Sequence, residues 1–284
     1  MTAVAHRSGT FTIAGKTVHR LGFGAMRLTG PGIWGEPDDR DEAIRTARRA
    51  VELGVDFIDT ADAYGPEVAD NILREALHPY PEQLLIATKA GHTRQGPNQW
   101  APVGRPEYLR QQVELSLRRL GVEQLDLLQL HRVDPLVPLA DQVGELKAMQ
   151  DEGKIHSLGL SEVTVEQIEQ ARLIAEIVTV QNEFNLTDRK SAQVLDYCTE
   201  QGLGFIPWAP IARGALAAPG GPVDEIAKAT GATPGQVSLA WLLAVSPVML
   251  PIPGTSKVAH LEENLGAAGL RLTDEQVARL TAAA

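Results

Sequence analysis

Cysteine is almost missing from this sequence, which excludes an intrachain disulfide and disfavours thiol chemistry. Cys198 is the only one among 284 residues, so no disulfide can form within the chain and a reducing compartment is expected. It stands in a helical pattern, where a buried, unreactive thiol is the expected state. The chemistry must therefore be sought in other residue types.

Basic charge and long apolar runs are scarce as well. The 26 lysines and arginines face 36 aspartates and glutamates, and the net charge of −10 disfavours nucleic acid as a partner. The apolar run at 240–245 is far shorter than the ~20 residues that cross a bilayer, and the N-terminus lacks the apolar segment of a secretory signal. We expect a cytoplasmic protein with no membrane partner, as a monomer or a small homo-oligomer.

Short apolar runs rich in branched residues alternate with segments of helical period, which predicts a parallel α/β fold. The expected strands are 20–26, 55–61, 84–90, 125–131, 156–161, 177–182, 204–210 and 248–254. Eight strand–helix units in ~250 residues favour a (β/α)8 TIM barrel. A doubly wound dinucleotide-binding sheet is disfavoured, because no G-x-G-x-x-G turn follows the first strand.

Both ends of the chain have local signals of their own. Residues 10–20 predict a β-hairpin that turns at Ala14-Gly15-Lys16 and caps the N-terminal end of the barrel. A last helix is expected after Thr273, with Gln276 completing the cap. No linker divides the sequence, so we expect a single barrel domain over residues 1–284.

Polar residues end several of the predicted strands, where the active sites of such barrels lie. The strand-end residues are Asp59, Lys89, His131, Ser161, Gln181, Trp208 and Gly254, and Tyr64 follows Asp59 by five positions. Singly, each has an ordinary structural explanation, such as a turn cap, a solvated strand end or a buried imidazole. Their convergence on one rim favours a functional site.

A metal site is not expected on this rim. Asp56, Asp59 and Asp62 are spaced three apart, but side chains of an extended strand alternate between its faces and these carboxylates cannot converge. The sequence also has no His-x-His pair and no H-E-x-x-H motif.

Asp59, Tyr64, Lys89 and His131 together have the chemistry of a general acid. A free tyrosine has a pKa of ~10, and an ammonium ~4 Å away at an effective dielectric of ~20 favours its phenolate by roughly 4 kcal/mol before desolvation is subtracted. Asp59 would keep Lys89 charged, and His131 could bind a carbonyl oxygen. A nicotinamide would supply the missing hydride.

The later strand ends favour a nicotinamide dinucleotide. Ser161 and Gln181 could bond a carboxamide, and the indole of Trp208 could stack on a flat ring. After the last strand, 253–257 brings hydroxyls and an ammonium to a helix start, which is typical of a phosphate site.

These stretches resemble the aldo-keto reductase superfamily from about residue 20 to 270. The matching motifs are GVDFIDTADAYG, TKAG, LLQLHRVD, GKIHSLGLS, VQNEFN, PWAPIARG and IPGTSKVAHLEENLGA. The resemblance implies a barrel that binds NADPH/NADP+ without a Rossmann motif. It also implies a catalytic tetrad of Asp59, Tyr64, Lys89 and His131, with Tyr64 as the acid.

The same resemblance implies the cofactor contacts. They are Gly24, Ala25, Met26, Asp59, Ser161, Glu162, Gln181, Trp208, Ala209, Pro210, Ile211, Arg213, Gly214, Gly254, Thr255, Ser256, Lys257, His260, Glu263 and Asn264. Three depart from the usual pattern: Glu162 replaces Asn, Trp208 replaces Tyr, and His260 replaces Arg. We expect Glu162 to favour the oxidised cofactor modestly, and Lys257 to be the main determinant of NADP preference.

The long C-terminal loop of many relatives has no counterpart here, so the loops at 30–39 and 91–104 are expected to contact substrate. Trp34 and Trp100 are the candidates, with Tyr64 and His131. The sequence resembles the short-looped bacterial branch that includes pyridoxine 4-dehydrogenase, which implies reduction of pyridoxal or of small aldehydes and ketones. The alternatives are a non-catalytic NADP-binding subunit, as in channel β subunits, and a metal-free lyase on the same barrel.

Overall fold

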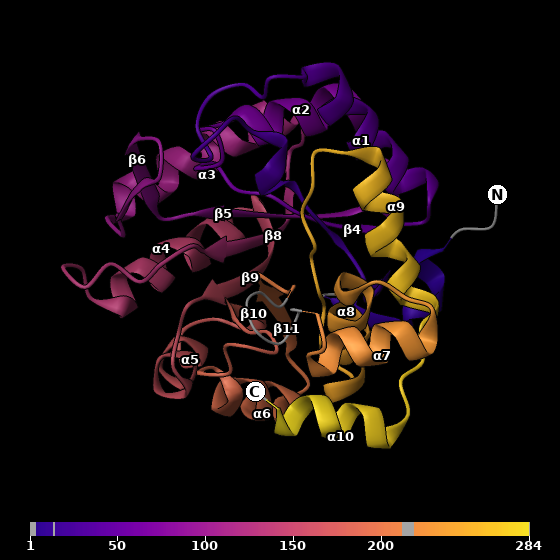
Figure 1. The fold of residues 1–284 in the computed structure, drawn as a ribbon. Coiled ribbons are helices and arrows are strands. Elements are labelled where there is room, and N and C mark those ends of the chain that lie inside the picture. The colour runs from indigo at the N-terminus through magenta and orange to yellow at the C-terminus, as the bar shows by residue number, and fades with distance from the viewer. Residues whose placement is uncertain (1–3, 14, 212–218, 284) are drawn as a thin grey trace.

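Seven parallel strands curl around the centre of the molecule and the helices lie outside them (Figure 1). The computed structural model describes residues 4–13, 15–211 and 219–283. In spatial order the strands are β3 (Phe23–Gly24), β4 (Phe57–Asp59), β5 (Leu85–Ala90), β8 (Leu125–Leu130), β9 (Ile155–Ser161), β10 (Ile177–Glu183) and β11 (Gly204–Trp208). All of the paired neighbours run parallel.

The segment 248–254 closes the sheet into a barrel. It forms isolated parallel bridges, Phe205↔Met249 on one side and Gly24↔Gly254 on the other. The prediction of an eighth regular strand here was wrong in detail, because Pro251 and Pro253 have no backbone N–H to donate to a ladder. Their carbonyl oxygens still accept from Gly22 N at 2.9 Å and Gly24 N at 3.3 Å, so the (β/α)8 prediction is confirmed.

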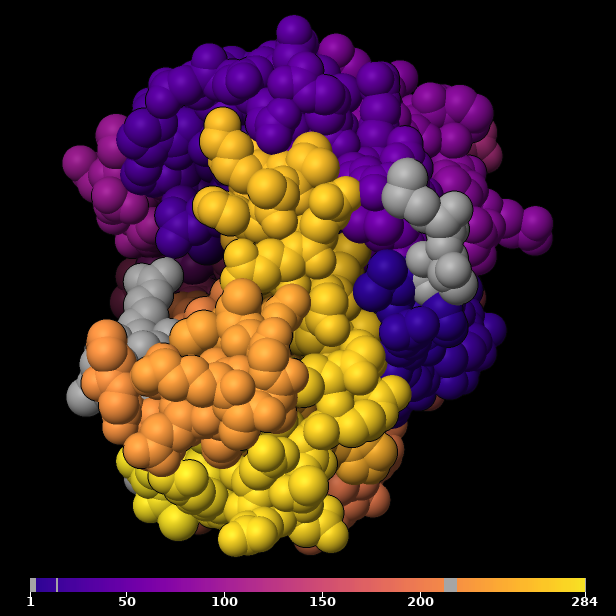
Figure 2. Space-filling view, turned by 45° about the vertical axis from the view of Figure 1, so that its right-hand side comes forward, coloured from indigo at the N-terminus to yellow at the C-terminus, as the bar shows by residue number. Residues whose placement is uncertain are grey.

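The helices surround this barrel. They are η1 (Ala5–Ser8), η2 (Ala25–Leu28), α1 (Arg40–Glu52), α2 (Val68–Leu77), α3 (Pro106–Leu120), α4 (Leu139–Asp151), α5 (Val165–Arg172), α6 (Ala192–Gln201), α7 (Pro222–Thr230), α8 (Pro234–Val245), α9 (Val258–Gly266), η4 (Ala267–Gly269) and α10 (Asp274–Ala282). Helix α9 lies between the N-terminal part of the chain and α7–α8, as Figure 2 shows in yellow, indigo and orange. No helix in the described part of the chain is long and apolar enough to cross a membrane.

Local sequence signals set the helix ends. The Thr273 side chain accepts from Gln276 N and forms the predicted capping box of α10. The thiol of Cys198 in α6 is fully buried, and burial raises its pKa to about 12, which confirms the expected unreactive cysteine.

The predicted hairpin is present as β1 (Thr10–Ile13) and β2 (Lys16–His19). It caps the N-terminal end of the barrel, where Ile13 and Val18 pack in one apolar cluster with Phe57, Leu85, Leu127 and Ile206. A second hairpin, β6 (His92–Gly96) and β7 (Gln99–Pro102), follows β5 and was not predicted. It stands at the opposite, C-terminal end of the strands, beside the predicted site.

Candidate active site

The ends of the parallel strands bring the predicted polar residues to one rim. Asp59 ends β4, Lys89 is the last but one residue of β5, His131 follows β8, Ser161 ends β9, Gln181 lies near the end of β10, and Trp208 ends β11. Residues far apart in the chain are therefore close in space, because neighbouring strands run parallel in register.

Lys89 is the centre of the site. Its Nζ donates to Asp59 Oδ2 at 2.6 Å, to the carbonyl of Thr60 at 2.9 Å and to the Tyr64 hydroxyl at 3.1 Å. The side chain is entirely buried. Burial lowers the pKa of Lys89, but Asp59 and Tyr64 outweigh it, so the net pKa is raised and the ammonium stays charged.

Tyr64 is 6% exposed, and burial raises its pKa although the Lys89 ammonium acts in the opposite direction. The ammonium lowers the pKa in the expected direction, but desolvation is the larger effect and the net pKa is raised. The phenol consequently holds its proton near neutral pH. It is a proton donor, with an ammonium in place to stabilise the phenolate after transfer.

Asp59 is fixed on its other oxygen by two amides. Gln181 Nε2 donates to Asp59 Oδ1 at 2.8 Å, and Gln129 Nε2 donates to the same atom at 3.2 Å. The amide N–H2 of Gln181 is thus used inside the protein, so any contact with a cofactor falls to its Oε1. Gln129 was missed because it precedes the strand end by one residue and lies inside the barrel.

His131 is a neutral imidazole. Burial, Lys89 and His92 hold its pKa well below the usual value. Its ring lies edge-on to Tyr64, with centroids 5.9 Å apart, and edge-on to His92 at 4.5 Å. His92 comes from the unpredicted hairpin, and burial lowers its pKa to about 4.

The β6–β7 hairpin also positions the predicted substrate residues. Trp100 is edge-on to Tyr64 at 6.4 Å and to His131 at 6.1 Å, so it borders the tetrad. The Arg94 guanidinium stacks on Trp100 at 3.6 Å and lies 5.8 Å from the Trp34 ring. Arg94 was not singled out from the sequence; its place in the same predicted loop as Trp100 was the available signal.

Arg94 also joins three loops through their main chains. It donates to the carbonyl oxygens of Gly32, Ile33, Ala63 and Gln99 at 2.7–2.9 Å. The Trp34 loop, the turn before Tyr64 and the hairpin are thereby held as one wall.

Glu162 and Trp208 contact each other directly. Trp208 Nε1 donates to Glu162 Oε1 at 2.7 Å, and the Glu183 N–H donates to the same oxygen at 2.7 Å. Glu162 has a left-handed backbone, with φ of 55°. Arg132, another residue not singled out from the sequence, donates to Ser161 Oγ at 3.1 Å beside this pair.

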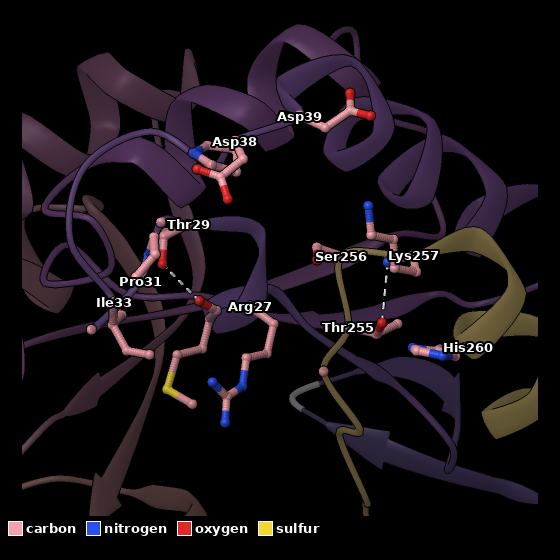
Figure 3. Close-up of a pocket in the computed structure, with 15 residues that line it drawn as sticks. Arg27, Thr29, Pro31, Ile33, Asp38, Asp39, Thr255, Ser256, Lys257 and His260 are labelled. Carbon is pink, nitrogen blue, oxygen red and sulfur yellow. Dashed lines mark hydrogen bonds between the residues drawn. The ribbon is translucent and has the colours of Figure 1, made fainter.

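A pocket of about 460 Å³ lies where the last predicted strand meets η2 and the start of α1. Six predicted cofactor residues line it: Met26, Gly254, Thr255, Ser256, Lys257 and His260. Figure 3 shows Thr255, Ser256 and Lys257 on one wall, facing Asp38 and Asp39 across the opening. Arg27 adds a second cation to its lining.

The remaining predicted cofactor residues lie outside this pocket. Gly24 ends β3 and Ala25 begins η2, Ala209, Pro210 and Ile211 follow β11, and Glu263 and Asn264 lie on α9. Arg213 and Gly214 fall outside the described residues. In the described part of the chain, no group of three or more His, Cys, Asp or Glu residues could hold a metal ion.

Comparison with known proteins agrees with this geometry. The aldo/keto reductase family model matches residues 20–284. An uncharacterised oxidoreductase of Schizosaccharomyces pombe is 55% identical over 97% of this chain and 90% of its own. Pyridoxine 4-dehydrogenase of Escherichia coli is 43% identical over 96% of this chain and 97% of its own.

A solved structure has the same fold. The glycerol dehydrogenase of Gluconobacter oxydans superposes with a TM-score of 0.85 at 26% identity, covering 96% of this chain and 94% of its own. With a family match over almost the whole sequence, the chain belongs to the aldo/keto reductase family and is an oxidoreductase.

Proposed function

We propose that the protein reduces aldehydes and ketones to alcohols with NADPH, and that Tyr64 is the proton donor. One observation above all supports this: a single buried ammonium, Lys89, contacts both Asp59 at 2.6 Å and the Tyr64 hydroxyl at 3.1 Å. Such a set protonates an oxyanion as it forms, because the resulting phenolate is stabilised by a fixed positive charge.

The residues of the 460 Å³ pocket fit a dinucleotide phosphate. Arg27 and Lys257 supply cations, Thr255 and Ser256 supply hydroxyls, and helix α9 begins at Val258 with its positive dipole end. Trp208 and Ser161 stand on the rim nearer the tetrad, where they would border the nicotinamide. When bound there, NADPH supplies the hydride for the carbonyl carbon.

The protein's own groups do the rest of the work. Tyr64 gives its proton to the carbonyl oxygen, Lys89 stabilises the phenolate, and Asp59 keeps Lys89 charged and in place. His131 is neutral, so it can hold the carbonyl oxygen by a hydrogen bond without adding a positive charge. Trp100 and the hairpin shield the phenol from water.

For the substrate we propose pyridoxal or other small aldehydes. The support is the 43% identity to a pyridoxine 4-dehydrogenase over nearly the full length of both chains. Aromatic side chains around the tetrad, Trp100 foremost, suit a flat ring.

The test is NADPH oxidation by purified protein with pyridoxal, simple aldehydes and 2-ketoacids, comparing the wild type with Tyr64→Phe. We expect Tyr64→Phe to lose ~10²–10⁴-fold in kcat, while NADPH still quenches tryptophan fluorescence. Turnover that survives the loss of the hydroxyl would refute Tyr64 as the acid. Fluorescence quenching without turnover of any carbonyl would favour a non-catalytic NADP-binding subunit.

A further inference from the structure

Arg132 is a half-buried cation at the rim that the tetrad does not use. It directly follows His131, and its Nη1 donates to the His131 carbonyl at 2.7 Å and to Ser161 Oγ at 3.1 Å. Among the residues that the structure describes, its Nε and Nη2 have no hydrogen-bond partner, and no carboxylate lies within ion-pair distance. A partly desolvated guanidinium is costly without an anion, so this one is suited to an anion from a ligand.

The nearest acidic side chains are already engaged elsewhere. Glu162 accepts from Trp208 Nε1 and the Glu183 N–H, both at 2.7 Å, and Glu183 pairs with Lys190 at 2.5 Å. Burial lowers the pKa of Arg132, although Glu162 and Tyr64 act in the opposite direction. Its charge in turn acts on Tyr64 and on His131, so the guanidinium is within electrostatic reach of the reacting centre.

We propose that Arg132 determines substrate specificity by binding an anionic oxygen next to the carbonyl that is reduced. The inference rests on the proposed function, since it names the substrate class of the same site. His131 and Arg132 are consecutive, so one substrate can place its carbonyl oxygen at His131 and Tyr64 and a neighbouring oxyanion at Arg132. The preferred substrates are aromatic aldehydes with an ionised ring hydroxyl beside the formyl group, or 2-ketoacids, which have a carboxylate in the equivalent place.

The bound anion takes no part in the bond changes. Hydride adds to the carbonyl carbon, the proton of the Tyr64 hydroxyl adds to the carbonyl oxygen, and the nicotinamide is oxidised. Arg132 holds the substrate before and after this step without changing its own protonation. Its contribution is therefore expected mainly in KM, and only for substrates with the anion.

Three carbonyl compounds separate this role from general activity. Pyridoxal has an ionised hydroxyl beside its aldehyde, 3-O-methylpyridoxal has the same shape without the anion, and pyridine-4-carbaldehyde lacks the substituent. We expect the wild type to prefer pyridoxal over the other two by about tenfold or more in kcat/KM, about the effect of one hydrogen bond to a charged group. Phenylglyoxylate, with a carboxylate beside its ketone, tests the 2-ketoacid arm.

Arg132→Gln should remove the preference. The kcat/KM of this variant should fall about tenfold more for pyridoxal than for pyridine-4-carbaldehyde, and Arg132→Lys should recover part of the difference. Arg118→Gln, an exposed arginine on α3, is the matched control and should keep the wild-type preference. Thermal unfolding of each variant checks its fold, and the substrate comparison on the wild type stands even where a variant does not fold.

The possible failures are distinct. Absence of NADPH oxidation with every carbonyl would contradict the proposed function itself. Equal kcat/KM for pyridoxal and 3-O-methylpyridoxal, or an unchanged preference in Arg132→Gln, would overturn the role of Arg132 and leave the reductase intact. A preference for phenylglyoxylate over pyridoxal would assign the site to carboxylates.

Discussion

The indole N–H of Trp208 donates to the carboxylate of Glu162 at 2.7 Å. This contact fixes a negative charge beside the residue proposed to stack on the nicotinamide. Because that ring is neutral when reduced and positive when oxidised, the carboxylate should favour the oxidised cofactor.

We therefore expect Glu162→Gln to lower the NADP+ over NADPH affinity ratio by about fivefold, which corresponds to ~1 kcal/mol of lost Coulomb energy. Titration of tryptophan fluorescence with each cofactor form measures the ratio. Glu176→Gln, an exposed change before β10 at the opposite end of the barrel, is the control. Equal ratios in all three proteins would exclude the electrostatic effect.

Lys89→Met should destabilise the protein as well as inactivate it. The change leaves the buried carboxylate of Asp59 without its cation, which costs about 3–5 kcal/mol in free energy of unfolding. Urea unfolding measures this loss. The double variant Asp59→Asn/Lys89→Met should recover much of the stability and none of the activity; a double variant as unstable as the sum of the single ones would show that the two charges are not coupled.

Asp62 should make stability depend on pH. Burial, and next the neighbouring Asp70, raise its pKa from 3.8 to about 8, while Arg119 and Lys89 act in the opposite direction. One of its oxygens is buried without a partner in the described part of the chain. The folded state binds this proton more tightly than the unfolded state, so stability falls as pH rises from about 4 to about 8.

Asp62→Asn should remove that dependence. We expect its melting temperature to change less than that of the wild type over this pH range, and to exceed the wild-type value near pH 8. If the melting temperatures of the two proteins change with pH to the same extent, a group other than Asp62 is responsible for the pH dependence.

Lys257→Met should weaken NADPH binding by about tenfold and NADH binding by less than about twofold, since only NADPH has a 2′-phosphate on its adenosine ribose for the ammonium to contact. Lys257 is exposed and lines the pocket, so its removal should leave the fold intact. Lys228→Met, an exposed lysine on α7, is the control. Equal loss of affinity for both cofactors would show that Lys257 does not contact the 2′-phosphate.

Glu42→Gln should strengthen NADPH binding, whereas Lys257→Met should weaken it. Glu42 Oε1 accepts from Val258 N at 3.1 Å, which puts a carboxylate at the start of α9 beside Lys257. The hydrogen bond from that N–H lowers the pKa of Glu42 most, and the hydrogen bond from Arg45 lowers it further, so the group is charged at neutral pH. Removing its repulsion should tighten NADPH binding about threefold at low salt and less at high salt; an effect that is insensitive to salt would argue against repulsion.

Much of this architecture was predictable because its signals are local. Apolar runs, glycine stops and caps such as Thr273 depend on residues near each other in the chain, and the barrel and its hairpin cap follow from their order. The β6–β7 hairpin was missed because its strands are short and polar, without an apolar alternation to reveal them. The closing segment 248–254 was predicted as a strand because its apolar run is real, although its prolines prevent a continuous ladder.

The amino-acid order alone established which groups stand at the strand ends, because strand period and turn residues place each of them independently of the rest. Proton affinity and the direction of each side chain came from the folded barrel. Burial raises the pKa of Tyr64 despite Lys89. Tertiary contacts also turn the amide of Gln181 toward Asp59, and they leave Arg132 beside His131 with no carboxylate within ion-pair distance among the described residues. Desolvation and pairing depend on every neighbour at once, and these neighbours are drawn from segments far apart in the chain.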